Sequence, residues 1–159
     1  MPTLAIIWRA ADLLFATGID SVIEVLPPVA WSPTPAVPAW VRGLFCYRDR
    51  LIPLVDVSLL LGGPPTPDRM VNRVLVVRRT DGAGTVEWPV GLWVESVQDL
   101  ARLDFSAAGH HPGFATQAGR FLGPVVQTQW GQVQLVRPAE IFSSEQTAVL
   151  ADRLREAAA

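Results

Sequence analysis

Proline and glycine interrupt this sequence so often that few stretches are long enough for a helix of several turns. Its 159 residues include 14 prolines and 12 glycines, and the apolar runs between them are short. Short apolar runs bounded by turn-forming residues are typical of β-strands. The sequence therefore predicts a mainly β fold. Strands are expected over residues 4–8, 12–17, 22–26, 44–47, 51–55, 73–78, 88–97, 121–128 and 132–136, although residues 13–16 alone also suit a buried helical turn.

The segments between these strands give further signals. Residues 27–38 hold five prolines with no change of composition beyond them, which indicates an extended surface loop rather than a linker. Residues 48–50 and 81–84 indicate hairpin turns. Asp56 stands between a predicted strand and a short helical turn, where its carboxylate can accept unpaired backbone N–H groups. Gly62 then ends that turn, so we assign Asp56 and Gly62 structural roles.

The C-terminal part of the chain has a different pattern. Ser143 and Gln146 have the spacing of a helix capping box, and good helix formers follow them. An α-helix is therefore predicted over about 144–157, docked on the β core by one apolar side. A chain of this length buries roughly 70% of its unfolded surface, and we expect residues 1–159 to form a single domain.

Charge and cysteine content restrict the classes of partner and site. The net charge is −2 and no block of like charges occurs, so nothing favours nucleic acid or an anionic membrane. The N-terminus lacks a basic export signal and no apolar stretch reaches membrane-spanning length, which predicts a cytoplasmic protein without membrane insertion. Cys46 is the only cysteine, which rules out an internal disulfide and a four-cysteine metal site. No cofactor is predicted.

Few residues suggest chemistry. His110 and His111 lie in a glycine- and proline-containing stretch and would not converge on one metal if extended. Cys46 lies within an apolar run, where it would be a small core residue or an interface residue. A hydrolase built on Cys46 and either histidine is a remote hypothesis that requires these side chains to meet in the fold. We predict a protein that is not an enzyme.

The six tryptophans are numerous for a chain of this size. Trp88 and Trp93 lie at odd separation in one predicted strand, so they would face opposite ways and at least one would be exposed or at an interface. Trp40 ends the proline-rich loop, and core packing and partner contact suit it equally. A pocket lined by Trp88 or Trp93 would support a second hypothesis, a stand-alone β-barrel that binds a small molecule.

The central part of the chain resembles the chemotaxis coupling protein (CheW-like) family. Residues 37–48 read VPAWVRGLFCYR and residues 51–57 read LIPLVDV, similar to the family's proline, glycine, asparagine-x-arginine-glycine and apolar-proline-apolar-apolar-aspartate signature. The resemblance continues at residues 22–25, 72–77, 91–97, 121–123 and 132–136 and in the predicted C-terminal helix. It thus covers nearly the whole chain, with its pieces in the family's order.

The resemblance implies two small SH3-like five-stranded β-barrel subdomains that share a core, with a C-terminal α-helix. It also implies an adaptor that couples the cytoplasmic tip of a chemoreceptor to the regulatory domain of a CheA-like histidine kinase, with self-association in arrays. Glu24, Gly43 and Arg48 match family positions linked to receptor contact or to the shape of that surface. The candidate receptor-binding residues are Glu24, Trp40, Val41, Gly43, Tyr47 and Arg48.

The sequence departs from the family signature at several positions. Asp49 replaces the glycine after the arginine, and its carboxylate could pair with Arg48 or Arg50. Cys46 replaces the asparagine, Glu95 replaces an aspartate, and residues 137–138 read Arg-Pro where the family has leucine-aspartate. These departures suggest a divergent pathway, such as a surface-sensing or motility-related array, rather than the main flagellar chemotaxis system.

Overall fold

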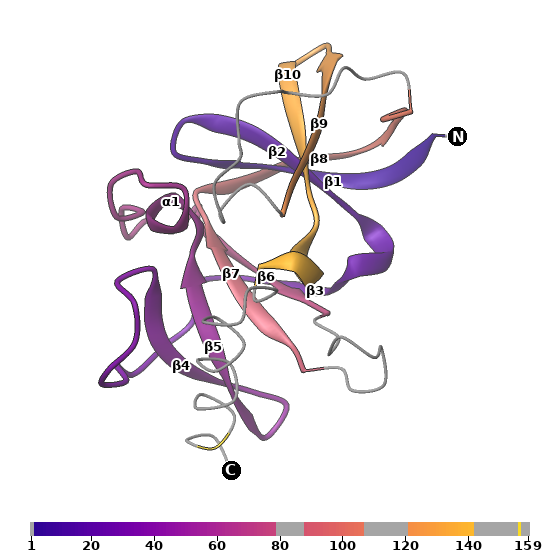
Figure 1. Cartoon of the computed structure of the whole chain (residues 1–159). Helices are drawn as coiled ribbons and strands as arrows, with labels where there is room; N and C mark the ends of the chain where they lie inside the picture. The colour runs from indigo at the N-terminus through magenta and orange to yellow at the C-terminus, as the bar shows by residue number, and fades with distance from the viewer. Residues whose placement is uncertain (1, 79–87, 107–120, 142–155, 157–159) are drawn as a thin grey trace.

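A computed structural model describes residues 2–78, 88–106, 121–141 and 156, and these residues form two five-stranded sheets (Figure 1). The first sheet has the strand order β8-β1-β2-β10-β9 and the second has the order β3-β6-β7-β5-β4. The mainly β fold with two five-stranded sheets is thereby confirmed. His110 and His111 lie outside the described residues. So does the predicted C-terminal helix, of which only Glu156 is described.

The first sheet joins the beginning of the chain to its later part. The strands β1 and β2 form a hairpin, β8 pairs antiparallel with β1, and β10 pairs parallel with β2. Because the N-terminal hairpin lies in the middle of this sheet, the sheet cannot form without contacts that are distant in sequence. The bounds are β1 Thr3–Ala10, β2 Leu13–Gly18, β8 Ser96–Leu103, β9 Leu122–Thr128 and β10 Gly131–Val136.

The second sheet is built from the middle of the chain. The hairpin β4–β5 lies at one side, β7 pairs parallel with β5, and β3 forms the opposite edge beside β6. Short helical elements connect or follow the strands: η1 Ile19–Ser21, α1 Val57–Leu60 and η3 Pro138–Glu140. The bounds are β3 Val22–Leu26, β4 Val41–Tyr47, β5 Arg50–Asp56, β6 Arg73–Val77 and β7 Val90–Val94.

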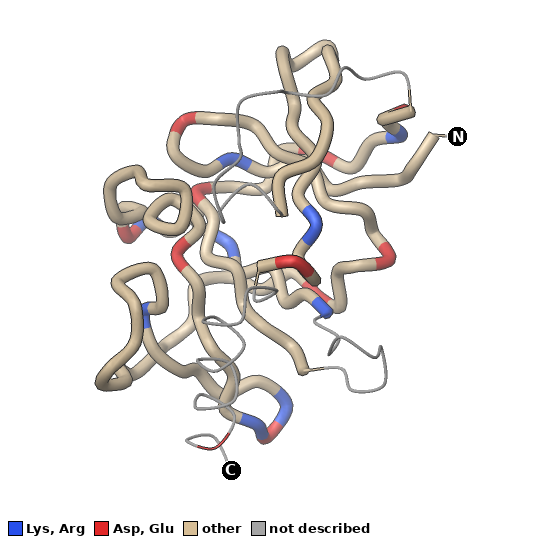
Figure 2. Tube along the Cα trace, in the orientation of Figure 1, with Lys and Arg blue, Asp and Glu red and all other residues tan. Residues whose placement is uncertain are grey.

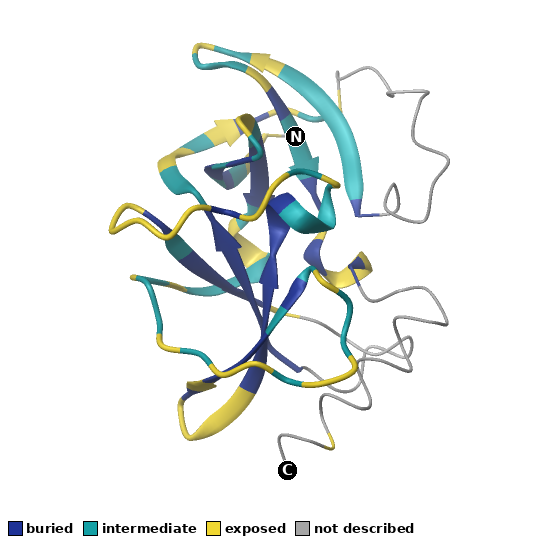
Figure 3. Ribbon diagram, turned by 90° about the vertical axis from the view of Figure 1, so that its left-hand side faces the viewer, coloured by how far each residue is buried: buried dark blue, intermediate teal, exposed yellow. Residues whose placement is uncertain are grey.

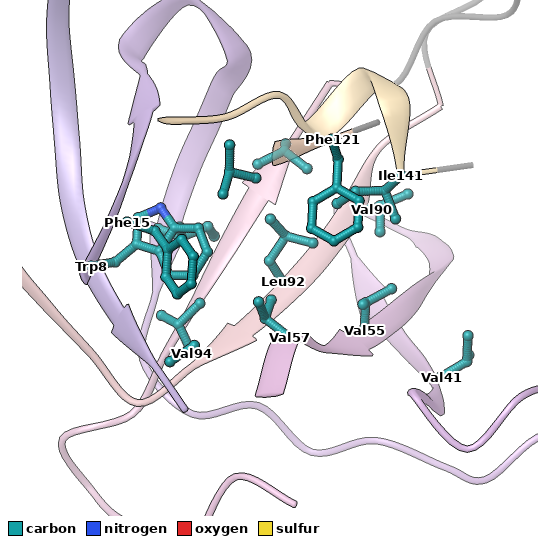
Figure 4. Packing of buried hydrophobic residues seen from close by; sticks show 14 of the residues in the cluster. Trp8, Phe15, Val41, Val55, Val57, Val90, Leu92, Val94, Phe121 and Ile141 are labelled. Carbon is teal, nitrogen blue, oxygen red and sulfur yellow. The ribbon is translucent and has the colours of Figure 1, made fainter. Parts of the chain in front are cut away.

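Three apolar clusters hold the sheets together. The largest lies between the two sheets and takes side chains from both, among them Trp8, Phe15, Leu92 and Phe121 (Figure 4). A second cluster fills the inside of the second sheet around Phe45 and Trp93, and a smaller one fills the inside of the first sheet. The buried strands run through the middle of the molecule while the exposed residues gather at its loops and turns (Figure 3). The two halves therefore share their main core.

The strand β7 is buried on both faces. Its alternate residues Val90, Leu92 and Val94 belong to the core between the sheets, whereas Trp93 packs into the second cluster. Trp88 is 2% exposed and Trp93 is 3% exposed. The prediction that at least one of these tryptophans would be exposed or at an interface is wrong, since opposite faces of this central strand both meet apolar cores.

The single strand predicted over residues 88–97 is two strands in the structure. The chain leaves the second sheet after Val94, and the N–H of Glu95 donates to the carbonyl of Arg9 at 2.9 Å. It continues as β8 in the first sheet, which the sequence analysis did not predict beyond residue 97. This crossing at Glu95 links the two sheets directly.

No helix among the described residues is long and apolar enough to cross a membrane.

Candidate functional site

The β4–β5 hairpin ends in a tight turn formed by two residues with positive φ. Tyr47 pairs with Arg50 across the turn, and the two residues between them have φ values of 48° at Arg48 and 63° at Asp49. Two positive φ values are the mark of a type I′ turn, which matches the twist of the flanking strands. Aspartate adopts this conformation more readily than most residues, whereas arginine adopts it at a cost of roughly 1 kcal/mol.

Three of the predicted site residues meet beside this turn. The Tyr47 hydroxyl donates to Oε2 of Glu24 at 2.7 Å, and Nη2 of Arg48 lies 3.5 Å from the same oxygen. The guanidinium carbon of Arg48 lies 5.1 Å from the centre of the Tyr47 ring. Glu24 lies on β3 and Tyr47 on β4, the two edge strands of the second sheet. These contacts therefore connect the two edge strands across the seam where they are not paired by the backbone.

This cluster, which we call the seam cluster (Glu24, Tyr47 and Arg48), is accessible to a partner. The side chain of Arg48 is 69% exposed and that of Glu24 is 42% exposed. An ion pair this exposed contributes little to stability, typically below about 1 kcal/mol. The guanidinium of Arg48 can therefore exchange its contact with Glu24 for a contact with another protein at a small cost in free energy.

Tyr47 forms the buried base of the seam cluster. Burial, followed by the hydrogen bond to Glu24, raises the pKa of the Tyr47 hydroxyl above its ordinary value of 10.0. The hydroxyl is therefore a hydrogen-bond donor throughout the physiological range. Because it donates to Glu24, it fixes the carboxylate that faces Arg48.

The other three candidates lie at the beginning of β4 and are less accessible. Val41 is buried in the main core and Trp40 is half-buried against it. Gly43 is also buried, and a Cβ built on it would lie 1.9 Å from the carbonyl oxygen of Ser32. Ser32 and Leu44 exchange two backbone hydrogen bonds of 2.9 Å here. Gly43 thus allows the proline-rich segment to approach β4, and of these three residues only Trp40 is partly exposed.

Asp56 is the centre of a buried polar network that the sequence analysis identified only in part. Its Oδ1 accepts the N–H of Leu59 at 3.4 Å, which is the helix-capping contact. Its Oδ2 also accepts two guanidinium nitrogens of Arg42 at 3.0 and 2.6 Å, and Thr66 donates to both carboxylate oxygens. The sequence analysis did not single out Arg42. An arginine within an otherwise apolar strand near a buried aspartate was the available signal.

Arg42 also attaches the proline-rich loop to the second sheet. Its guanidinium carbon lies 4.8 Å from the Trp93 ring centre and 5.8 Å from the Trp31 ring centre. Such cation–π contacts are worth roughly 0.5–2 kcal/mol each. Trp93 Nε1 is buried without a hydrogen-bond partner among the described residues, so the ring serves packing and the cation. Gly62, with φ of 85°, ends the turn after α1.

Cys46 and Asp49 are both exposed on the hairpin. Cys46 is exposed on β4, so the prediction that it could be a core residue is wrong and the interface alternative remains. Asp49 makes no hydrogen bond or ion pair with the described residues, and Arg48 pairs with Glu24 instead of with its neighbour. The carboxylate at the turn is therefore free on the described surface.

A pocket of about 450 Å³ lies where the β1–β2 turn meets the loop after α1. Its lining includes Arg9, Asp12, Arg69 and Glu95 together with prolines of the loop, and neither Trp88 nor Trp93 takes part. This pocket is therefore not the tryptophan-lined cavity expected for a small-molecule-binding barrel. Among these residues, no group of three or more histidine, cysteine or acidic side chains could hold a metal ion.

Comparison with known proteins finds a family whose sequence model matches most of the chain. The sequence model of the CheW-like domain matches residues 5–146. The chain is 28% identical over 142 residues to the chemotaxis protein CheW of Rhizobium meliloti, covering 89% of this chain and 88% of that protein. It is 35% identical over 74 residues to the protein PilI of Pseudomonas aeruginosa, a match that covers 46% of this chain and 42% of PilI.

The fold has a solved counterpart. The crystal structure of the scaffolding protein TtCheW from Thermoanaerobacter tengcongensis superposes with a TM-score of 0.76, covering 91% of this chain and 95% of that one. The two sequences are 21% identical, so this likeness concerns the fold. It accounts for the two-sheet arrangement around the shared core.

Proposed function

Because the chain belongs to the CheW-like family, we propose that it is an adaptor that couples chemoreceptors to a CheA-like histidine kinase in chemosensory signalling. The observation that carries this proposal is the family match over residues 5–146. Relatives named as chemotaxis proteins in two organisms support it. The whole chain, residues 1–159, would act as one CheW-like domain.

The seam cluster is the surface we assign to the receptor. Arginine offers several N–H donors in a fixed fork, which suits carboxylates and backbone carbonyls on a helical receptor tip. Arg48 supplies that fork, Glu24 and Tyr47 hold it, and Trp40, Val41 and Gly43 support the strand from which it extends. The exposure of Arg48 and its solvent-exposed ion pair with Glu24 support this assignment.

The second partner in this proposal is the regulatory domain of the kinase. The family resemblance supports it, together with self-association of the adaptor and kinase in receptor arrays on the cytoplasmic side of the membrane. The role requires no catalysis: CheW-like proteins are scaffolds rather than enzymes, and we propose the same for this chain.

Binding measurements on purified proteins test the proposal. The unmodified chain should bind a soluble receptor-tip fragment and a kinase regulatory domain at micromolar strength. Arg48→Glu should weaken receptor binding by about 10-fold or more, since it removes the fork and places two like charges against Glu24. Isothermal titration calorimetry gives the affinity, and circular dichroism shows whether the fold is retained.

Arg102→Glu is the matched control, because Arg102 is an exposed arginine on β8 that makes no hydrogen bond or ion pair with the described residues. It should bind both partners as the unmodified chain does. If neither partner binds the unmodified chain, the adaptor proposal fails. If both arginine variants retain full receptor binding and the native fold, Arg48 is not a receptor contact.

A further inference from the structure

The tip of the β4–β5 hairpin presents charges of both signs in succession. Arg48, Asp49 and Arg50 follow one another at the end of this hairpin, and Figure 2 shows basic and acidic colours together at a hairpin end. Asp49 is exposed and makes no hydrogen bond or ion pair with the described residues, although an arginine stands on each side of it. Its negative charge is therefore not used to hold the hairpin together.

The backbone at these two positions has a conformation that few non-glycine residues adopt, although aspartate adopts it more readily than arginine. Arg48 and Asp49 both have positive φ, at 48° and 63°. Non-glycine residues in this region cost free energy, and they persist where the surrounding structure imposes the conformation. The Cα atoms of the two residues are one peptide apart, about 3.8 Å. The turn thus carries a positive and a negative side chain on adjacent residues, with the Arg48 guanidinium directed to Glu24 and the Asp49 carboxylate left without an ion pair among the described residues.

We propose that this turn recognises a pair of opposite charges on the partner helix, with Arg48 facing a carboxylate and Asp49 facing a lysine or arginine. The inference rests on the proposed function, since it assumes that the receptor tip meets this hairpin. On a helix, residues three or four apart lie on one face with Cβ atoms about 5–6 Å apart, so an acidic and a basic residue one turn apart can face the side chains of two adjacent turn residues.

Asp49 is then a residue that determines specificity. A helix with acidic groups at both positions would gain a contact with Arg48 and suffer repulsion from Asp49. Repulsive elements of this kind discriminate between similar partners even where they add little affinity. The partner that fits is a helix carrying one acidic and one basic residue a single turn apart.

Two substitutions at Asp49 test the proposal with the soluble receptor-tip fragment as the probe. Asp49→Asn keeps the size of the side chain and tolerates positive φ, so its fold is not in question. It should weaken binding about 3-fold, and Asp49→Lys about 10-fold at low salt, with smaller losses at high salt. Asp68→Lys, at an exposed aspartate without a partner among the described residues, makes the same charge change and should bind normally.

A charge exchange completes the experiment. Each basic residue of the fragment is replaced in turn by glutamate, and one of these fragments should bind Asp49→Lys more tightly than it binds the unmodified chain. If Asp49→Asn and Asp49→Lys both bind like the unmodified chain while Arg48→Glu does not, the inference about Asp49 is overturned and the adaptor function stands. If the unmodified chain does not bind the fragment at all, the receptor part of the proposed function fails instead.

Discussion

Tyr47 is the only tyrosine in the chain, and its hydroxyl donates to Glu24 across the seam between β3 and β4. The chain also contains no lysine, so few groups other than Tyr47 ionise in the alkaline range. The state of the seam cluster can therefore be followed through the absorbance of a single ring. That makes the effect of pH on this cluster unusually easy to measure.

We expect the folded protein to titrate above the ordinary tyrosine pKa of 10.0. Burial and the hydrogen bond to Glu24 raise the pKa in the folded state, so the folded chain keeps the proton to higher pH than the unfolded chain does. The stabilisation is therefore fully present below pH 10.0 and is lost as the pH rises through the raised pKa. The absorbance of tyrosinate is measured against pH for the folded chain in buffer and for the unfolded chain in denaturant. The two curves give the pKa of Tyr47 in each state.

The Tyr47→Phe variant provides the control. Its melting temperature should fall less steeply than that of the unmodified chain as the pH rises above 10.0. Equal absorbance midpoints in the folded and the denatured chain would contradict the role given to burial and to Glu24.

Sequence reasoning at the level of single residues succeeded where the reason was local. The cap role of Asp56 depends on its position before α1, and the turn at residues 48–49 depends on the adjoining strands. The partner Arg42 depends on how β4 lies against the loop that carries Thr66, and a linear sequence does not specify that arrangement. The pairing of Arg48 with Glu24 was missed for the same reason, since 24 residues separate them.

Secondary-structure elements were predictable where apolar residues alternate or cluster. The strand β3 begins and ends as predicted, and the β4–β5 hairpin turns where residues 48–50 indicated it. The strand β8 was missed beyond residue 97 because it is an edge strand whose residues 98–100 are exposed. The exposure expected for Trp88 or Trp93 was wrong because each of the two tryptophans meets an apolar core, Trp88 the main core and Trp93 the second cluster.

Ser32 and Trp31 are among the residues that attach the proline-rich segment 27–38 to the second sheet. Ser32 pairs with Leu44, and Trp31 packs on the second cluster and lies near the guanidinium of Arg42. Trp31→Ala removes the aromatic contact and leaves the backbone pairing. We expect a loss of about 2 kcal/mol in the free energy of unfolding, from lost apolar burial and a lost cation–π contact.

The same change should release the segment locally. Limited proteolysis should cleave residues 27–38 faster in Trp31→Ala than in the unmodified chain, at a temperature where both remain folded. Pro35→Ala is the control for the segment itself, because Pro35 is exposed and belongs to no apolar cluster. Unchanged cleavage in Trp31→Ala would mean that the contacts of the Trp31 ring do not hold the loop.

For the whole molecule, the main core between the sheets determines whether the two halves behave as one. The cluster combines Trp8 and Phe15 from the first sheet with Leu92 and Val55 from the second (Figure 4). The chain also crosses between the sheets at η1, which leads into β3, and at Glu95. An adaptor that holds two partners in a fixed relation requires halves that do not move independently, and a shared core provides this rigidity.

Leu92→Ala tests this cooperativity. Leu92 is fully buried on β7, toward the middle of the cluster in Figure 4. Truncation should lower the free energy of unfolding by about 2–5 kcal/mol through lost burial and a cavity. Because the core belongs to both sheets, urea unfolding followed by fluorescence and by circular dichroism should keep one coincident transition in the variant.

Val133→Ala is the matched comparison, since Val133 is fully buried in the small cluster inside the first sheet. Hydrogen exchange separates the two variants: Leu92→Ala should accelerate exchange in β1 and β2 as well as in β5 and β7, because both sheets lose a common support. Val133→Ala should act mainly on the first sheet. If Leu92→Ala accelerates exchange in the second sheet alone, the halves are independent, and coupling between receptor and kinase would have to depend on the Glu95 crossing rather than on the core.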